Sequence, residues 1–287
     1  MNQLRFQWTV SDAVTRLIMI NVFVFLAIHI PLSLLHLFGG AGLEASINSY
    51  LFLPGDFVDL LVKPWTLLTH MFMHTGLLHL IFNMLTLYFA GQLFARYFSD
   101  KRLLSLYFSG GLAGALVFLL AVNVFPLFTR SGSVHTAAGA SAAILSVLIG
   151  IAAFRPDDEV FLFGVIRMKL RWLALIIIVL DVLQIRSGNA AGHLAHLGGA
   201  AWGIVWGMRL KACSDIAAFL NPVWDIGKPK STLKVKHRAA SIRKPSELNT
   251  REKQTEIDKL LDKISRSGYD SLSKDEKQRL FELTKEQ

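Results

Sequence analysis

The stretch Ala137-Ala138-Gly139-Ala140-Ser141-Ala142-Ala143 opens a hydrophobic segment, and the rest of the chain is organised around it. Apart from the serine, it contains only alanine and glycine. Such small side chains let neighbouring helices approach closely, and they leave room around the Ser141 hydroxyl. Taken alone, the pattern favours helix packing over catalysis. Its meaning depends on which polar residues the other segments bring to the same level.

Composition places the chain in a membrane. It has 287 residues, of which 53% are hydrophobic and 18% charged, with a mean hydropathy of +0.44. These values, together with apolar residues in long blocks, indicate a polytopic membrane protein with a polar tail. The single cysteine, Cys213, excludes an internal disulfide and a cysteine metal cluster. The first apolar run is too long for a cleavable signal peptide and reads as a signal anchor.

Six segments are long enough to cross a bilayer. The sequence therefore predicts an all-α membrane protein, a bundle of six transmembrane helices followed by a cytosolic helical hairpin. The expected domains are a membrane domain at 1–211, a basic linker at 212–248 and a small hairpin at 249–287. An amphipathic connection, 38–75, is expected to lie partly in the membrane interface. The six segments are 14–37, 76–95, 103–125, 138–154, 170–186 and 191–210.

Basic residues in the loops predict the orientation. With the N-terminus inside, the inner loops hold nine Lys or Arg residues and the outer loops hold three, in line with the positive-inside rule. Both termini are therefore expected in the cytosol, and the expected location is the inner (plasma) membrane of a bacterium. The inner residues are Arg5, Arg16, Arg96, Lys101, Arg102, Arg155, Arg167, Lys169 and Arg171, and the outer ones are Lys63, Arg130 and Arg186.

The polar tail predicts two short helices. Residues 211–287 hold 17 Lys and Arg against 12 Asp and Glu, so that most of the net charge of +9 lies there. The basic stretch 228–244 suits anionic lipid heads, and a solvated linker is an equal alternative. Asn249-Thr250-Arg251-Glu252 and Ser273-Lys274-Asp275-Glu276 resemble helix caps, and Gly268 can end the first helix. The apolar positions are Ile257, Leu260, Leu261 and Ile264 in the first helix, and Leu280, Phe281 and Leu283 in the second.

Three segments bring a hydroxyl and two imidazoles to one depth. His79, Ser141 and His196 each fall near the outer end of a segment that runs from outside to inside. At about 1.5 Å per residue, each lies roughly 5–10 Å below the outer interface. If the segments pack together, His196 can accept the Ser141 proton and return it to a leaving amine, which is the arrangement of a nucleophile and its base.

The spacing of small residues supports that packing. Gly199, Gly203 and Gly207 recur every four residues and predict a bare stripe on the last segment, suited to the small residues after Ser141. On the second segment, Asn83 lies one turn after His79 and on the same face. With the Ser141 backbone N–H, these two side chains could receive the oxyanion of a tetrahedral intermediate.

Several separated motifs together resemble those of the rhomboid intramembrane serine proteases. They are His74-x4-His79-x3-Asn83, Gly139-x-Ser141 and Ala195-His196-x2-Gly199-x3-Gly203, in the family's order and helix placement, with Trp65 as a loop element. The resemblance covers about residues 14–210. It implies a Ser141–His196 dyad without a third acid, an oxyanion site from His79 and Asn83, no cofactor, and transmembrane protein substrates cut near the outer face. The partner of the tail stays unknown, and nothing predicts nucleic-acid binding.

The chain departs from the family pattern at four positions. The glycine usual after the serine is Ala142, and the arginine that often follows the loop tryptophan is Thr66. Leu145 replaces a tyrosine common one turn after the serine, and Ala95 replaces an acid often found at the inner end of the second segment. None of these changes removes a catalytic atom.

Three other functions compete with the protease. A metal site could use His193 and His196, or His70 and His74, but the second and sixth segments contain no carboxylate or cysteine, so we predict no metal. An inactive relative that binds transmembrane helices would typically lack the serine or the histidine. A transporter would explain Asp181, an acid inside a membrane segment, but the halves show no internal repeat. We expect Asp181 to meet a polar neighbour or the cavity, and to serve packing, hydration or movement of its segment.

Overall fold

The computed structural model describes residues 12–39, 42–130, 134–162, 164–186, 188–225 and 250–285. It divides into two compact units, Met1–Lys228 and Pro229–Gln287. The first holds the hydrophobic segments, and the second holds two helices of the polar tail. Arg5, the basic stretch 228–244 and the expected cap residue Asn249 lie outside the described residues.

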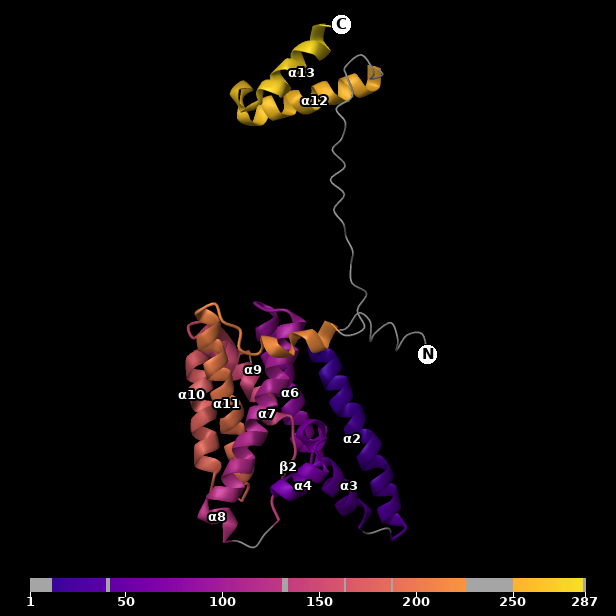
Figure 1. Ribbon diagram of the computed structural model, residues 1–287, viewed down its shortest axis with the longest axis vertical. Helices are drawn as coiled ribbons and strands as arrows, with labels where there is room; N and C mark the ends of the chain where they lie inside the picture. Colours follow the sequence, from indigo (N-terminus) through magenta and orange to yellow (C-terminus); the bar gives the residue numbers. More distant parts are fainter. Residues whose placement is uncertain are drawn as a thin grey trace. The chain divides into compact units, whose positions relative to one another are not determined.

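The six longest helices described in the membrane part of the chain each agree with an expected segment to within three residues (Figure 1). The protein is thus a mostly helical membrane protein. Among the described residues, three helices are both long and apolar enough to span a bilayer, namely α2, α6 and α7, and α9 is a shorter apolar helix. The number of spans stays a prediction. The helices are α2 (Ala13–Leu37), α6 (Leu77–Ala95), α7 (Asp100–Val124), α9 (Ser141–Phe154), α10 (Leu170–Gln184) and α11 (Ala190–Lys211).

Short elements join the long helices. The connection between α2 and α6 contains α3 (Leu43–Leu51), α4 (Phe57–Val62), α5 (Thr66–Thr69) and η1 (His70–Phe72), and α8 (Pro126–Thr129) follows α7. Trp65 donates its indole N–H to the Tyr50 carbonyl at 2.8 Å and thereby fastens α3 to the loop before α5.

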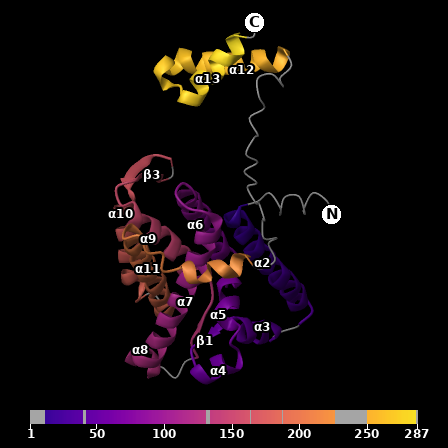
Figure 2. The same ribbon diagram turned by 45° about the horizontal axis from the view of Figure 1, so that its top comes forward.

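Two small antiparallel strand pairs correct the all-α expectation. The strand β1 (Leu53–Pro54) pairs with β2 (Thr136–Ala137), and β3 (Glu159–Leu162) pairs with β4 (Ile166–Lys169). Figure 2 shows the β3 hairpin at one end of the bundle, where α9 connects to α10. Strands of two to four residues are too short to leave a period of two in the sequence, which is why the sequence did not reveal them.

The core lies where α9 packs against α7 and α11, and the expected glycine stripe is there. A Cβ atom on Gly199 would lie 2.1 Å from the Ala142 carbonyl oxygen, and one on Gly203 would lie 2.4 Å from that of Ser146. The same close approach continues at Gly207, next to the Gly150 carbonyl oxygen. Because the clashing atoms are backbone, no side-chain movement could make room, and the two helices touch only because α11 is bare on this face.

The chain stays on the membrane unit beyond α11, which corrects the expected start of the linker at residue 212. Residues Ala218–Asp225 form the 3-10 helix η2. The Trp224 indole N–H donates to the Ser105 hydroxyl of α7 at 2.9 Å, and this hydroxyl donates to the Asn221 side chain. Lys101 of α7 also pairs with Asp225. These polar contacts hold the segment against α7, and composition alone did not predict them.

The second unit contains α12 (Thr250–Ser267), the 3-10 helix η4 (Tyr269–Ser271) and α13 (Lys274–Lys285). Gly268 ends α12 with a positive φ of 78°, as expected. Ser273 and Glu276 form the expected capping box, since each side chain bonds the backbone N–H of the other. Ile257 and Leu283 are buried between the helices, whereas other apolar side chains, Leu261 and Phe281, remain exposed.

The contact of α11 with α9 yields a stability prediction. Gly203→Val should separate the two helices and cost about 1–3 kcal/mol, as overpacking of a tight core does. Thermal unfolding of the purified protein in detergent measures the loss. Ala201→Val, which adds two methyl groups at an exposed position of the same helix, is the control and should leave the midpoint nearly unchanged. An unchanged midpoint for Gly203→Val would contradict the close contact.

Candidate functional site

The Ser141 side chain stands at the first turn of α9, at the end of an extended segment that is fastened on both sides. The β1–β2 pairing fixes the register of Leu53 with Ala137, and the Gly139 N–H donates to the His70 carbonyl at 2.8 Å. Gly139 has a φ of 129°, and a Cβ there would lie 2.9 Å from His79 Nε2. Only glycine fits both the backbone angle and the space. The turn therefore delivers Ser141 to the site in one defined position.

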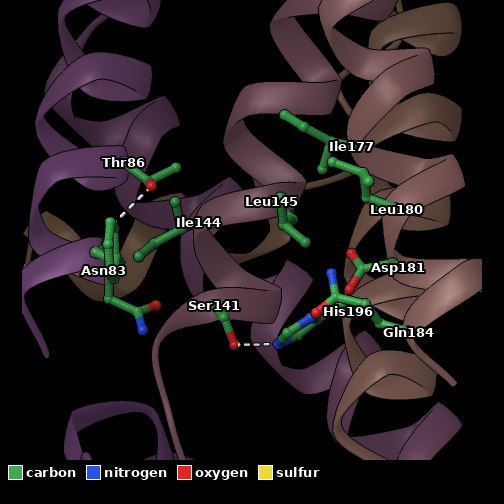
Figure 3. A pocket seen from close by; sticks show the side chains of 11 residues that line it. Asn83, Thr86, Ser141, Ile144, Leu145, Ile177, Leu180, Asp181, Gln184 and His196 are labelled. Atoms are coloured by element: carbon green, nitrogen blue, oxygen red, sulfur yellow. Dashed lines mark hydrogen bonds and ion pairs between the residues drawn. The ribbon is translucent and has the colours of Figure 1, made fainter. Parts of the chain in front are cut away.

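The expected partner of Ser141 is within hydrogen-bond distance. His196, in the second turn of α11, places Nε2 2.6 Å from Ser141 Oγ (Figure 3). The two residues are 55 positions apart in the sequence, and the contact follows from the tight packing of α9 on α11 just below them. A hydroxyl and an imidazole at this distance can exchange a proton.

The two expected oxyanion residues line the same site from α6. His79 Nδ1 lies 3.4 Å from the Thr75 backbone nitrogen, which donates to it, so the ring proton is left on Nε2, the atom that faces Gly139. Asn83 uses one amide hydrogen on the His79 carbonyl at 2.8 Å. In Figure 3 the Asn83 amide points into the pocket, with Ser141 between it and His196. Both residues can offer an N–H group to an oxygen held near Ser141.

Asp181 of α10 completes the cluster, and sequence reasoning missed its partners. Its Oδ1 atom lies 2.9 Å from His196 Nδ1 and 2.7 Å from His193 Nδ1. The expectation that Asp181 meets a polar neighbour is confirmed. Its assignment to packing, hydration or helix movement overlooked the direct contact with His196. The signal was the acid inside an apolar segment, combined with two histidines three residues apart on one helix face.

Two cavities meet at Ser141 and His196. One, of about 260 Å³, lies between α6, α9, α10 and α11 and is lined by Asn83, Leu145, Asp181 and other side chains. The second, of about 340 Å³, lies on the side of β2 and is lined by His79, Gly139 and Asn189 among others. An extended peptide that crosses the site would therefore find space on both sides of the Ser141 hydroxyl.

Two further histidines, His70 and His74, lie in the loop before α6, beside the site. His70 donates its Nδ1–H to the Thr66 carbonyl at 2.8 Å, and burial lowers the pKa of this loop histidine to about 4. His74 is buried, and its ring centroid lies 5.1 Å from that of His79. His70 thus lines the second cavity, and His74 packs against His79.

The cluster also bears on the metal alternative. The carboxylate that the second and sixth segments lack comes from α10. Asp181, His193 and His196 offer ligand atoms within 4.8 Å of one another, a set that could hold a divalent cation. Their direct hydrogen bonds satisfy the same polar atoms without one.

The fold and the site define a helical membrane protein with a serine–histidine pair between its helices. The family model of the Rhomboid domain matches residues 62–212, which is more than half of the chain. The chain belongs to the rhomboid family. A second model, of a family of unknown function (DUF6576), matches residues 247–286 and thus the helices of the second unit.

Three curated relatives illustrate the breadth of the family. The chain is 31% identical over 155 residues to RHOMBOID-like protein 12, mitochondrial, from Arabidopsis thaliana, across 51% of this chain and 46% of the relative. It is 30% identical over 142 residues to Rhomboid protease GluP of Bacillus subtilis (strain 168), across 48% of this chain and 24% of that protein. Presenilin-associated rhomboid-like protein A, mitochondrial, of Danio rerio is 26% identical over 136 residues, across 46% and 34%. The matches cover less than half the length of each relative.

The short contact between Ser141 and His196 predicts a reactive hydroxyl. A fluorophosphonate probe in detergent should label the wild-type protein. It should not label Ser141→Ala, and it should label His196→Ala more slowly than the wild type. Gel fluorescence measures the rate. Ser146→Ala is the control, because the Ser146 hydroxyl on the same helix is buried and bonded to the Leu106 carbonyl at 3.0 Å. Equal labelling of Ser141→Ala would place the reactive serine elsewhere.

Proposed function

We propose that the protein is an intramembrane serine endopeptidase that cuts transmembrane segments of other membrane proteins near the outer face. The observation that supports it best is the 2.6 Å separation of Ser141 Oγ and His196 Nε2, at the meeting point of two cavities. In this proposal Ser141 attacks the scissile carbonyl carbon. His196 takes the hydroxyl proton and then delivers it to the leaving amine, which leaves an acyl-enzyme. A water molecule, deprotonated by His196, then releases the acid product.

The oxyanion of each tetrahedral intermediate would be stabilised by donors that are in place before the reaction. His79 Nε2–H faces the turn at Gly139, and the second amide hydrogen of Asn83 is available to the pocket. The Ser141 backbone N–H, at the start of α9, is a further donor, since the first N–H groups of a helix have no partner within it. Preorganised donors of this kind act on charge that develops only during the reaction.

The substrate would have to unwind before it is cut. The carbonyl groups of an intact helix are shielded by their own hydrogen bonds and neighbours, so a nucleophile cannot reach them. We therefore expect substrates with glycine, proline or small polar residues near the outer end of the segment. The small residues around Ser141 favour a small side chain immediately before the cut.

We also propose the membrane and the orientation. The excess of basic residues in one set of loops supports an arrangement with six spans, both termini and the hairpin in the cytosol, and the site toward the outside. A bacterial inner membrane is our proposal, although two of the relatives are named as mitochondrial. The alternative function is a catalytically inactive rhomboid-like protein that binds transmembrane helices, and the next experiment separates the two.

The central prediction concerns cleavage. Wild-type protein in proteoliposomes should cut a model transmembrane substrate, whereas Ser141→Ala and His196→Ala should not. The double variant should lose no more than either single variant, because nucleophile and base act as a unit. Mass spectrometry of the products locates the cut. Binding of the substrate without cleavage by the wild type would favour the inactive helix-binding protein.

The oxyanion residues should have graded effects. His79→Ala and Asn83→Ala should each lower kcat by on the order of 10²-fold, the usual cost of one lost donor, while other donors preserve some activity. Thr86→Val is the control, since it lies one turn beyond Asn83 in the same cavity and its hydroxyl donates to the Phe82 carbonyl. If neither alanine variant is slower than this control, the oxyanion site lies elsewhere.

A further inference from the structure

The Asp181 carboxylate contacts the base of the proposed reaction on the side away from the serine. His196 Nδ1 lies 2.9 Å from Asp181 Oδ1, and His196 Nε2 lies 2.6 Å from Ser141 Oγ. The imidazole thus bridges a carboxylate on α10 and a hydroxyl on α9. Figure 3 shows Asp181 and His196 close together on the side of the pocket formed by α10 and α11.

This contact determines which ring nitrogen carries the proton. An ionised carboxylate oxygen can only accept hydrogen bonds, so His196 Nδ1 must donate to it. In the neutral ring, Nε2 then has a free lone pair, and Ser141 must be the donor in the contact at 2.6 Å. That is the only tautomer in which His196 can take the serine proton. Without the carboxylate, either ring nitrogen could carry the hydrogen.

The surroundings make the carboxylate effective. The side chains of Asp181, His193 and His196 are 10%, 11% and 22% exposed, so little water screens their interactions. His193 donates from Nδ1 to the same oxygen at 2.7 Å and thus gives the buried charge a second partner. Within the part of the chain that the structure describes, His79 is a further ionisable group that interacts electrostatically with His196 across the site.

We propose that Asp181 is a positioning residue for His196, which makes the pair part of a Ser141–His196–Asp181 triad. The carboxylate holds the imidazole in the Nδ1–H tautomer and stabilises the imidazolium that forms when the serine proton is transferred. The inference rests on the proposed protease activity and departs from the dyad that the resemblance implies. His193 orients the carboxylate and is one contact further from the serine.

A purely structural role is the alternative explanation of the contact between Asp181 and His196. Asp181 is the only buried residue in the second half of α10, where the other residues between Leu175 and Gln184 are at least partly exposed. Its two bonds could serve chiefly to hold α10 against α11. A test must therefore separate loss of proton transfer from loss of helix docking.

The test compares Asp181→Asn, which keeps the shape and removes the charge, with the wild type. We expect kcat for the model substrate to fall by on the order of 10²- to 10⁴-fold, as in serine proteases that lose the acid. KM should stay within about threefold, and the acidic limb of the pH–rate profile should move to lower pH because the imidazolium loses its counter-charge. His193→Leu, which has no hydrogen-bond donor, is the matched control, since it removes the other tie between α10 and α11; kcat should fall less than tenfold. All buffers contain a chelator.

Three results would overturn the proposal. One is a fall in kcat of tenfold or less for Asp181→Asn. The second is a fall without movement of the acidic limb, and the third is an equal fall for His193→Leu, since these last two results indicate helix docking. The rate of fluorophosphonate labelling needs no substrate. If the wild type cuts no model substrate, the labelling rates of the same variants are compared by the same three criteria. Failure of the proposed function is thereby distinguished from failure of the triad.

A second variant covers the case in which Asp181→Asn does not fold. Asp181 lines the cavity of about 260 Å³, so Asp181→Ala leaves a space that a small anion can reach. Formate should then restore labelling of Ser141, and formamide, which has nearly the same size and no charge, should not. If the labelling rate of Asp181→Ala is the same with formate, with formamide and without either compound, the proposal is overturned.

Discussion

The structure depends on the direct contact between the backbones of α9 and α11. At Gly199 and Gly203 no side-chain atom separates the two helices, and the Ala142 and Ser146 carbonyl oxygens fill the space that a Cβ would need. Such closeness sets the position of the first turns of both helices. Ser141 and His196 stand in those turns, so their separation of 2.6 Å is a consequence of the packing below them. A wider crossing would separate the Ser141 hydroxyl from the His196 imidazole.

The site also shows how polar groups are accommodated within an apolar bundle. A buried carboxylate is costly unless it is hydrogen-bonded, and Asp181 meets two imidazoles on one oxygen. The extended segment before Ser141 would leave backbone groups without partners, and the two-residue strand β1 and the His70 carbonyl supply them. Each of these partners also fixes a group that faces the serine. The contacts that satisfy the buried polar atoms are thus the same contacts that order the site.

Much of the site was predictable because it depends on periodicity. Helix boundaries, the depth of His79, Ser141 and His196, and the glycine stripe all follow from residue spacing along helices. The contacts of Asp181 did not follow, since they depend on the rotation of α10 about its axis. That helix is half-exposed, and its apolar residues mark no single buried face, so the sequence does not indicate which side Asp181 presents. The two-residue strands and the return of residues 218–225 to α7 were missed for the related reason that they are set by partners distant in the chain.

The sequence by itself determined the class of protein, the helices and the candidate serine and histidine, because hydrophobic length, small-residue spacing and motif order are local properties. Membership of the rhomboid family follows from that same information. Only the tertiary structure decided which groups touch. It placed a carboxylate from α10 on the far nitrogen of His196, and it closed a hydrogen bond between residues 55 positions apart. Those distances arise from how helices cross and rotate against one another, and the chain specifies these only when all of its contacts form together.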